Sequence, residues 1–344
     1  MDMYWGEKPG LRVVNVADLS PVGEPFVELL SIDDRPLEWA RYSGLPANAL
    51  ERAVPRPRVS RYRAAWQAAN AARGATALVS HLPRMTAAVA DAARLRGIDT
   101  PHLAFSFNFT QLPAPAARTR FRRSLASVDQ FCTYTGFEAD LYAEVFAIPR
   151  DRFRPLCWTQ EAPVPGAVHP MLLPSGPFVA AVGGEGRDFA MLIAAARALP
   201  QVPFVVIARQ TPLLMDPPAN MTVHFNLPYA TCWGIAARAA ALLVPLRDAD
   251  TCCGHITLVS ARMLGLPIVT TRSRGTDEYT QDFAGTTLVP AGSVEGWVEA
   301  IRTVIADPDA ARAAAAIDHA EAATLYDRSR WSTYIRDFVA QARA

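Results

Sequence analysis

Residues 241–271 read ALLVPLRDADTCCGHITLVSARMLGLPIVTT. An apolar run leads into a polar loop and Gly254, an amphipathic segment continues to Gly265, and a second apolar run begins at Pro267. The pattern predicts a strand, a short helix and another strand. Because strands that are apolar on both faces are typical of a parallel sheet covered by helices, the stretch indicates an α/β fold.

The predicted start of this helix has the features of an anion-binding site. The backbone N–H groups of His255, Ile256 and Thr257 lie where a helix provides no internal acceptor. Together with the helix dipole they would form a seat for a diphosphate, which Gly254 would allow to approach closely. Thr257 and Ser260 would project hydroxyls from the same helix. The ring of His255 would either contact a phosphate or sugar oxygen or cover the turn.

The same alternation of apolar runs and helical periodicity extends along the chain. Other predicted strands lie at 11–16, 75–80, 102–107, 130–134, 178–182, 202–207 and 221–225. The pattern is interrupted at 161–177, EAPVPGAVHPMLLPSGP, which holds five prolines and two glycines. We therefore expect two doubly wound Rossmann-like α/β domains that face a cleft, at 1–165 and 178–325, with a linker at 166–177.

The last segment, 326–344, is expected to form a helix with one strongly apolar face. That face holds Trp331, Tyr334, Ile335, Phe338 and Val339. It is too apolar for a free tail, so the helix docks either on the second domain or on the first. We expect the helix to cross back and dock on the N-terminal domain.

Composition narrows the class of protein. The 344 residues are 51% hydrophobic and 19% charged, which provides enough apolar material for two cores. The net charge of +1 argues against an overall positive potential that would attract nucleic acids. No apolar run reaches the roughly 18 residues of a membrane span, and residues 1–10 do not resemble a signal peptide. Five scattered cysteines favour neither a disulfide framework nor a zinc site, and they suit a cytoplasmic location.

Arginine is the cation available for phosphate binding. Lys8 is the one lysine among 34 basic residues, which excludes a P-loop. Arg187, after the Gly183–Gly184 pair, and Arg209, at a strand end, are the expected diphosphate ligands, unless they are ordinary surface arginines. No metal is expected, because Asp248-Ala249-Asp250 fits a metal-binding D-x-D motif only nominally.

The C-terminal half resembles the nucleotide-sugar domain of the GT-B glycosyltransferases of the group 1 type. The similar pieces are FVAAVGG at 178–184, FVVIAR at 204–209, GHITLVSARMLGLPIV at 254–269 and GTDE at 275–278. The resemblance implies a glycosyltransferase of the hexosyltransferase type, which binds a nucleoside diphosphate sugar through Gly183, Gly184, Arg187, Arg209 and residues 254–257 and 260, without a cofactor.

The chain departs from that family at both glutamates of its E-x(7)-E block. Ser260 stands where the second glutamate would hold the ribose hydroxyls, and Cys252 stands where the first would contact the sugar. We read the vicinal Cys252 and Cys253 as small packing residues rather than a redox pair.

In the N-terminal half, the resemblance places His81 at the family's cleft histidine and Ser106 and Asn108 at later polar positions. His81 and Asn108 are the expected catalytic residues. His81 would act as a base or bond the transferring sugar, since imidazole titrates near neutral pH, or it would only cap a turn before Pro83. Asn108 could orient a hydroxyl.

Two arginine-rich stretches contain aromatic residues. One holds Arg52, Arg56, Arg58, Arg61 and Arg63 with Tyr62 and Trp66, and the other holds Arg118, Arg120, Arg122 and Arg123 with Phe121. They are either solvated faces or a surface for anionic lipid headgroups or a lipid-diphosphate acceptor on the inner face of the membrane. No nucleic-acid recognition motif accompanies them.

Three functions remain open. The first is a glycosyltransferase that acts on a glycan or lipid-linked acceptor, for example in polysaccharide biosynthesis. The second is a nucleotide-sugar epimerase, although the missing carboxylates count against it. The third is a non-catalytic nucleotide-sugar-binding protein with the same fold.

Overall fold

The computed structural model describes residues 10–18, 31–32, 35–54 and 58–342. Arg56 and residues 1–9, which entered the sequence analysis, lie outside this description. The chain divides into two compact units. Unit 1 comprises residues 1–157 and 328–344, and unit 2 comprises residues 158–327.

Unit 1 is built on a six-stranded sheet in the order β2-β3-β1-β4-β5-β6. The strands are β1 (Leu11–Ala17), β2 (Ser31–Ile32), β3 (Arg35–Ser43), β4 (Ala77–His81), β5 (His102–Phe105) and β6 (Gln130–Phe131). Every pairing is parallel except that of β2 with β3. β1 and β4 are neighbours and are buried almost throughout, as their apolar sequences predict.

Helices of unit 1 connect and cover these strands. They are α1 (Ala49–Ala53), α2 (Val59–Ala72), α3 (Pro83–Leu95), α4 (Pro115–Leu125) and α5 (Gly136–Phe146). Alanines on the inner face of α2 pack with Val14, Val16 and Leu78 of the sheet. A second core, centred on Phe107, Phe131 and Tyr142, fills the space beside α5.

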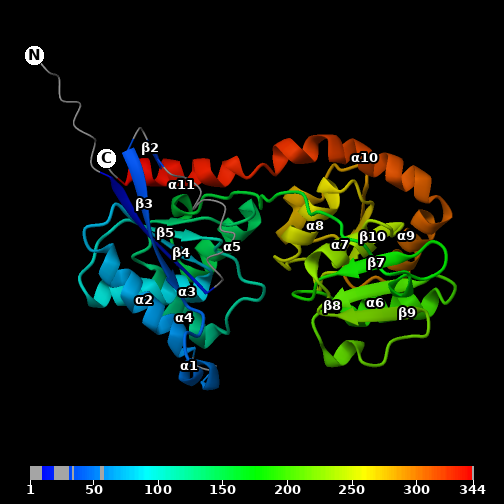
Figure 1. Ribbon diagram of the computed structural model, residues 1–344, viewed down its shortest axis with the longest axis horizontal. Coiled ribbons are helices and arrows are strands. Elements are labelled where there is room, and N and C mark those ends of the chain that lie inside the picture. Colours follow the sequence, from blue (N-terminus) through cyan, green and yellow to red (C-terminus); the bar gives the residue numbers. More distant parts are fainter. Residues whose placement is uncertain (1–9, 19–30, 33–34, 55–57, 343–344) are drawn as a thin grey trace, which may run out of the picture. The chain divides into compact units, whose positions relative to one another are not determined.

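The C-terminal helix α11 (Ser329–Gln341) belongs to unit 1, as the sequence predicts. Its side chains Trp331, Ile335, Phe338 and Val339 are buried. The ring of Trp331 lies edge-on to Phe105 at the end of β5, with centroids 5.4 Å apart. Figure 1 shows this helix in red along unit 1. The apolar face of the helix is thus the part that holds it to the N-terminal sheet.

Unit 2 has an all-parallel sheet in the order β12-β11-β10-β7-β8-β9. The strands are β7 (Val179–Val182), β8 (Phe204–Ala208), β9 (Met221–Phe225), β10 (Ala241–Val244), β11 (Ile268–Thr271) and β12 (Thr286–Val289). This is the strand order of a doubly wound sheet, in which the direction of winding reverses between the adjacent strands β7 and β10. The two sheets with their helices confirm the predicted two-domain α/β fold class.

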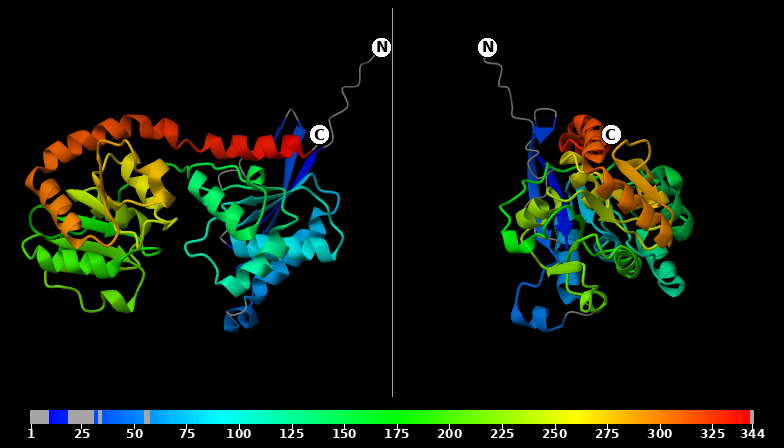
Figure 2. Two further views of the ribbon diagram at one scale, coloured as in Figure 1. Left: turned by 180° about the vertical axis from the view of Figure 1, so that it is seen from behind. Right: turned by 90° about the vertical axis from the view of Figure 1, so that its right-hand side faces the viewer.

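The helices of unit 2 are α6 (Phe189–Ala198), α7 (Tyr229–Ala236), α8 (His255–Met263), α9 (Val294–Ala306) and α10 (Pro308–Leu325), with a 3-10 segment η5 (Arg274–Tyr279). α6 packs against α9 and α8 packs against α10. Helices flank the sheet on both faces (Figure 2). Because ligands of such sheets bind where the winding reverses, at the carboxyl ends of the strands, the loops after β7 and β10 are the first place to look for a site.

Candidate functional site

Two loops meet at the carboxyl ends of β7 and β10. The loop after β7 runs from Gly183 to Asp188, and its backbone is bonded to the loop after β10: the N–H of Asp188 donates to the carbonyl oxygen of Pro245 at 2.9 Å, and the N–H of Arg247 donates to that of Gly186 at 3.2 Å. The adjacency of the two strands brings these distant parts of the sequence together.

Glycines make both loops possible at their tightest points. Gly183 has a φ of +108° and Gly254 a φ of +100°, in the left-handed region that other residues rarely adopt. A Cβ on Gly183 would lie 3.0 Å from Nη2 of Arg187, and one on Gly254 would lie 3.4 Å from Nη1 of the same residue. The two glycines therefore leave open the space beside one guanidinium group. Both are only half-buried, as is Gly184.

Arg187 is a buried cation held by neutral groups. Its guanidinium donates to the carbonyl oxygen of Glu185 at 3.0 Å and to the hydroxyl of Thr257 at 3.0 Å. Within the described residues it forms no ion pair with a carboxylate, and the exposed carboxylate of Glu185 lies 3.8 Å from Nη1 of Arg209. Burial lowers the pKa of Arg187 from its usual value. Because a buried charge is costly without a counter-charge, this position favours an anionic ligand.

The helix α8 begins beside this cation. Gly254 occupies its N-cap position and offers no side chain to the first turn. The first helical bond runs from the N–H of Leu258 to the carbonyl oxygen of Gly254 at 2.9 Å. In the part of the chain that the structure describes, no protein acceptor is found for the N–H groups of Ile256 and Thr257. These two donors, the positive end of the helix dipole and Arg187 converge on the same turn.

The ring of His255 makes contacts within the protein rather than with the proposed ligand. Its Nε2–H donates to the carbonyl oxygen of Gly275 at 2.8 Å, and the ring lies 4.7 Å from that of Tyr279. Burial lowers the pKa of His255 to about 4, so the ring is neutral at pH 7. Of the two alternatives for this histidine, the side chain adopts the structural one and holds η5 against the start of α8.

Ser260 lies further along α8 and is fully buried. Its Oγ accepts a hydrogen bond of 2.7 Å from Nε2 of Gln160, which follows the point where the chain enters unit 2. Two residues on, Arg262 donates to the hydroxyl of Tyr326, near the point where the chain leaves unit 2. The hydroxyl at the family's glutamate position thus anchors a connecting segment in this structure. Sequence spacing alone does not reveal this contact.

Two further predicted positions lie at the edge of the site. Arg209 follows β8 and is highly exposed, with its Nη1 3.8 Å from the carboxylate of Glu185. The backbone N of Arg209 is the nearest atom to a Cβ placed on Gly184, at 4.0 Å. Cys252 is buried and Cys253 is half-buried, and neither forms a disulfide within the part of the chain that the structure describes.

In unit 1, His81 ends β4, beside β1. Its Nε2 is bonded to Oδ1 of Asn15 on β1 at 2.9 Å, and its ring lies edge-on to Phe105. Burial lowers the pKa of His81 to about 3. The ring is therefore neutral at pH 7 and binds a proton far less readily than the expected imidazole near neutrality.

Asn108, the other predicted catalytic residue, is bonded to a carboxyl group that the sequence analysis missed. Its Nδ2 donates to Oε1 of Glu138, and the same oxygen accepts from the hydroxyl of Tyr142 at 3.0 Å. Oε2 of Glu138 accepts from the N–H of Tyr134 at 2.9 Å. Burial raises the pKa of Glu138 to about 7. The signal in the sequence was the capping box Thr135-x-x-Glu138 at the start of α5, which suggests only a helix start.

No known protein-family profile matches the chain, and no curated protein sequence matches it. Solved structures do. A glycosyltransferase from Rickettsia africae is 10% identical, with 97% of this chain and 98% of that chain covered, at a TM-score of 0.69. A sucrose-phosphate synthase from Thermosynechococcus elongatus is 13% identical, with 96% and 98% covered, at 0.69. Anabaena HepE, in complex with UDP and glucose, is 12% identical, with 96% and 100% covered, at 0.67.

At identities of 10–13% these likenesses concern the fold. They extend over both units and agree with the GT-B resemblance drawn from residues 178–278. The chain has the two-domain α/β fold of known glycosyltransferases.

Proposed function

We propose that the protein is a glycosyltransferase whose unit 2 binds the diphosphate of a nucleoside diphosphate sugar. The observation that carries this proposal is Arg187, a buried guanidinium without an ion-pair partner among the described residues, next to the N–H groups of Ile256 and Thr257. A diphosphate supplies the negative charge and the acceptor oxygens that this arrangement lacks. The fold shared with HepE, which was solved with UDP and glucose, supports the same assignment.

In this proposal the donor site assists departure of the nucleoside diphosphate. The bond between the anomeric carbon and the phosphate oxygen breaks, and its electron pair stays on the phosphate. Negative charge then grows on the β-phosphate, where Arg187, the α8 amides and the Thr257 hydroxyl would stabilise it. Arg209 would add a second, exposed cation at the rim. No metal is required for this role.

We place the acceptor on unit 1, where a hydroxyl oxygen would form the new bond to the anomeric carbon and pass its proton to the departing diphosphate. His81 and Asn108 would orient the reacting groups by hydrogen bonds. Since burial lowers the pKa of His81 to about 3, we assign it orientation rather than removal of that proton. A hexose donor and a glycan or lipid-linked acceptor at the cytoplasmic side suit the resemblance to group 1 enzymes.

The absence of both family glutamates favours a second candidate, a non-catalytic nucleotide-sugar-binding protein, because Ser260 and Cys252 offer no carboxylate. Incubation with radiolabelled UDP- and GDP-hexoses and a panel of glycan and lipid-linked acceptors tests the proposal. A labelled product whose formation is lost in Arg187→Met supports transfer. Donor binding with no product from any acceptor would favour the binding protein, and formation of a C2 epimer without an acceptor would identify an epimerase.

A further inference from the structure

Exposed apolar side chains are concentrated in residues 50–54 and 58–66, on and beside the first two helices of unit 1. They are Leu50, Val54, Val59, Tyr62 and Trp66, and we call this group, with Arg52 and Arg58, the α1–α2 patch. Leu50 is 75% exposed, and Tyr62 and Trp66 are each 45% exposed. Groups of large exposed apolar side chains are typical of interaction surfaces, whereas single scattered ones are common on any protein.

The geometry of α2 places three of these residues together. Val59, Tyr62 and Trp66 follow one another at spacings of three and four residues, so they share one face of the helix. The guanidinium of Arg96 lies over the ring of Trp66 at 4.7 Å and adds a cation to that face. The opposite face of α2 is lined by buried alanines, which pack on the sheet.

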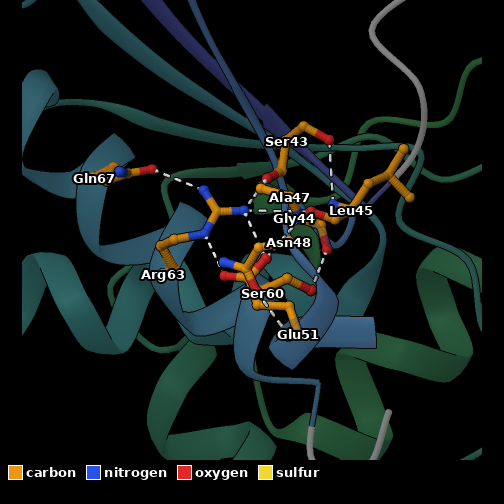
Figure 3. Close-up of polar contacts among 9 residues, drawn as sticks. All are labelled: Ser43, Gly44, Leu45, Ala47, Asn48, Glu51, Ser60, Arg63 and Gln67. Carbon is orange, nitrogen blue, oxygen red and sulfur yellow. Dashed lines mark hydrogen bonds and ion pairs between the residues drawn. The ribbon is translucent and has the colours of Figure 1, made fainter. Parts of the chain in front are cut away.

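A polar network holds α1 and its leading loop against α2 (Figure 3). Nε of Arg63 pairs with the carboxylate of Glu51 at 2.7 Å, and its Nη2 donates to the carbonyl oxygen of Leu45 at 3.2 Å. The hydroxyl of Ser60 donates to the carbonyl oxygen of Gly44 at 2.7 Å. These bonds hold the segment that carries Leu50 and Val54 in place against α2.

The same network removes negative charge from the surface. Glu51 is the one acidic residue in the sequence between Glu38 and Asp91, a stretch with eight arginines. Its side chain is only 6% exposed and is paired with Arg63. Arg52 and Arg58 are exposed. The imbalance extends to the whole unit, since unit 1 holds 24 basic and 17 acidic residues, against 10 and 16 in unit 2.

We propose that the α1–α2 patch docks on the surface of an anionic lipid bilayer. Exposed arginines match anionic headgroups, while leucine, valine and an aromatic pair match the boundary between headgroups and acyl chains. A soluble polyanion would use the arginines and gain little from the aliphatic side chains. This combination is absent from α4, where Arg120, Arg122 and Arg123 are exposed but Phe121 packs inward against Phe109 and Phe146.

Vesicle sedimentation of the full chain tests the proposal. We expect binding to vesicles of phosphatidylcholine mixed with phosphatidylglycerol, and little binding to phosphatidylcholine alone. The double variant Arg52→Ser/Arg58→Ser should weaken binding by about 30-fold, at about 1 kcal/mol for each arginine. Leu50→Ser/Val54→Ser should weaken it by about tenfold or more through loss of apolar insertion.

Matched controls separate the patch from general effects of charge and hydrophobicity. Arg120→Ser/Arg122→Ser on α4 removes the same charge, and Leu213→Ser/Met215→Ser removes two exposed apolar residues of unit 2. Both should bind anionic vesicles within about twofold of the wild type, because each leaves the patch intact. Thermal unfolding verifies that all variants are folded.

Three results would overturn the proposal: no binding to anionic vesicles, equal loss in patch and control variants, or binding that depends on Arg52 and Arg58 but not on Leu50 and Val54. The last result, with equal affinity for heparin, would identify a soluble polyanion as the partner. The patch is independent of the diphosphate site, so nucleotide binding by the same variants should be unchanged.

Discussion

The guanidinium of Arg187 donates to the hydroxyl of Thr257 across 3.0 Å, which joins the loop after β7 to the first turn of α8. The two residues are 70 positions apart in sequence and meet because β7 and β10 are neighbours in the sheet. The contact keeps a buried cation next to the amides at the helix start before any ligand arrives. Such preorganised donors favour a charge that develops on a leaving group, because they need not rearrange during the reaction.

Arg187→Met is expected to weaken diphosphate binding and to stabilise the ligand-free protein. It removes charge-assisted hydrogen bonds to a diphosphate, so affinity for UDP or GDP should fall by about 10- to 100-fold. It also removes a buried charge that forms no ion pair among the described residues, so the free energy of unfolding of the ligand-free protein should rise by about 1 kcal/mol. Calorimetric titration and denaturant unfolding measure the two effects.

Arg197→Met on α6 serves as the control, since Arg197 is exposed and lies in the same unit. It should leave both quantities unchanged. If Arg187→Met bound diphosphates as tightly as the wild type, Arg187 would have no part in the site.

Gly254→Ala should damage both the turn and the site. A Cβ at φ +100° costs about 1–2 kcal/mol of stability, and it would lie 3.4 Å from Nη1 of Arg187, where a phosphate oxygen is expected. Gly292→Ala is the matched control. Gly292 also has a left-handed φ, +74°, but no atom lies within 4 Å of the added Cβ. Both variants should lose stability, and Gly254→Ala alone should lose at least about tenfold in UDP affinity. Equal affinities in the two variants would argue against a seat at Gly254.

Arg209→Ala should act on the ligand only. The side chain is 85% exposed and makes one loose contact with Glu185, so the melting temperature should not change. Diphosphate affinity should fall by about three- to tenfold at low salt, and the difference should shrink as salt screens the charge. Titrations at two ionic strengths measure this, and unchanged affinity at low salt would remove Arg209 from the site.

Stability should fall as the pH is lowered from 6.5 towards 4. Burial lowers the pKa of His81 and His102 to about 3 and that of His255 to about 4, so near pH 5.5 the unfolded chain binds about three more protons on these residues. Burial raises the pKa of Glu138 to about 7, so the folded chain holds one more proton there. The net difference of about two protons predicts a loss of about 2–3 kcal/mol per pH unit.

His102→Gln should reduce that slope by about 1.4 kcal/mol per pH unit, because one of the three titrating rings is removed. His102 is bonded to Ser80 inside unit 1 and is not part of the proposed site. Urea unfolding at several pH values measures the slope. A flat profile between pH 6.5 and 4.5 would show that the buried histidines are not held neutral by the fold.

The sequence predicted the parts of the fold that are apolar on both faces. The strands β7, β8, β10 and β11 were recognised because helices cover both sides and leave runs such as FVVIA and ALLV. β3 was missed because its sequence, RPLEWARYS, is mostly half-buried or exposed and lacks such a run. β12 was missed for the same reason, since only its last residue, Val289, is buried.

The candidate site was predicted where it depends on local sequence. Gly254 and the amides that follow it belong to one strand–loop–helix unit, whose geometry a short motif determines. Other contacts arise from packing between segments that are distant in the sequence. They are the hydrogen bonds between Arg187 and Thr257, between Gln160 and Ser260, and between Asn108 and Glu138. No local pattern contains such information.

Calorimetric titration of the wild-type protein with UDP, UMP and uridine, and with the corresponding guanosine series, tests whether unit 2 binds a nucleotide through its diphosphate. A seat made of Arg187 and the α8 amides predicts that at least one diphosphate binds and that removal of each phosphate weakens binding by about tenfold or more. A nucleoside that binds as tightly as its diphosphate, or the absence of binding by both UDP and GDP, would contradict it.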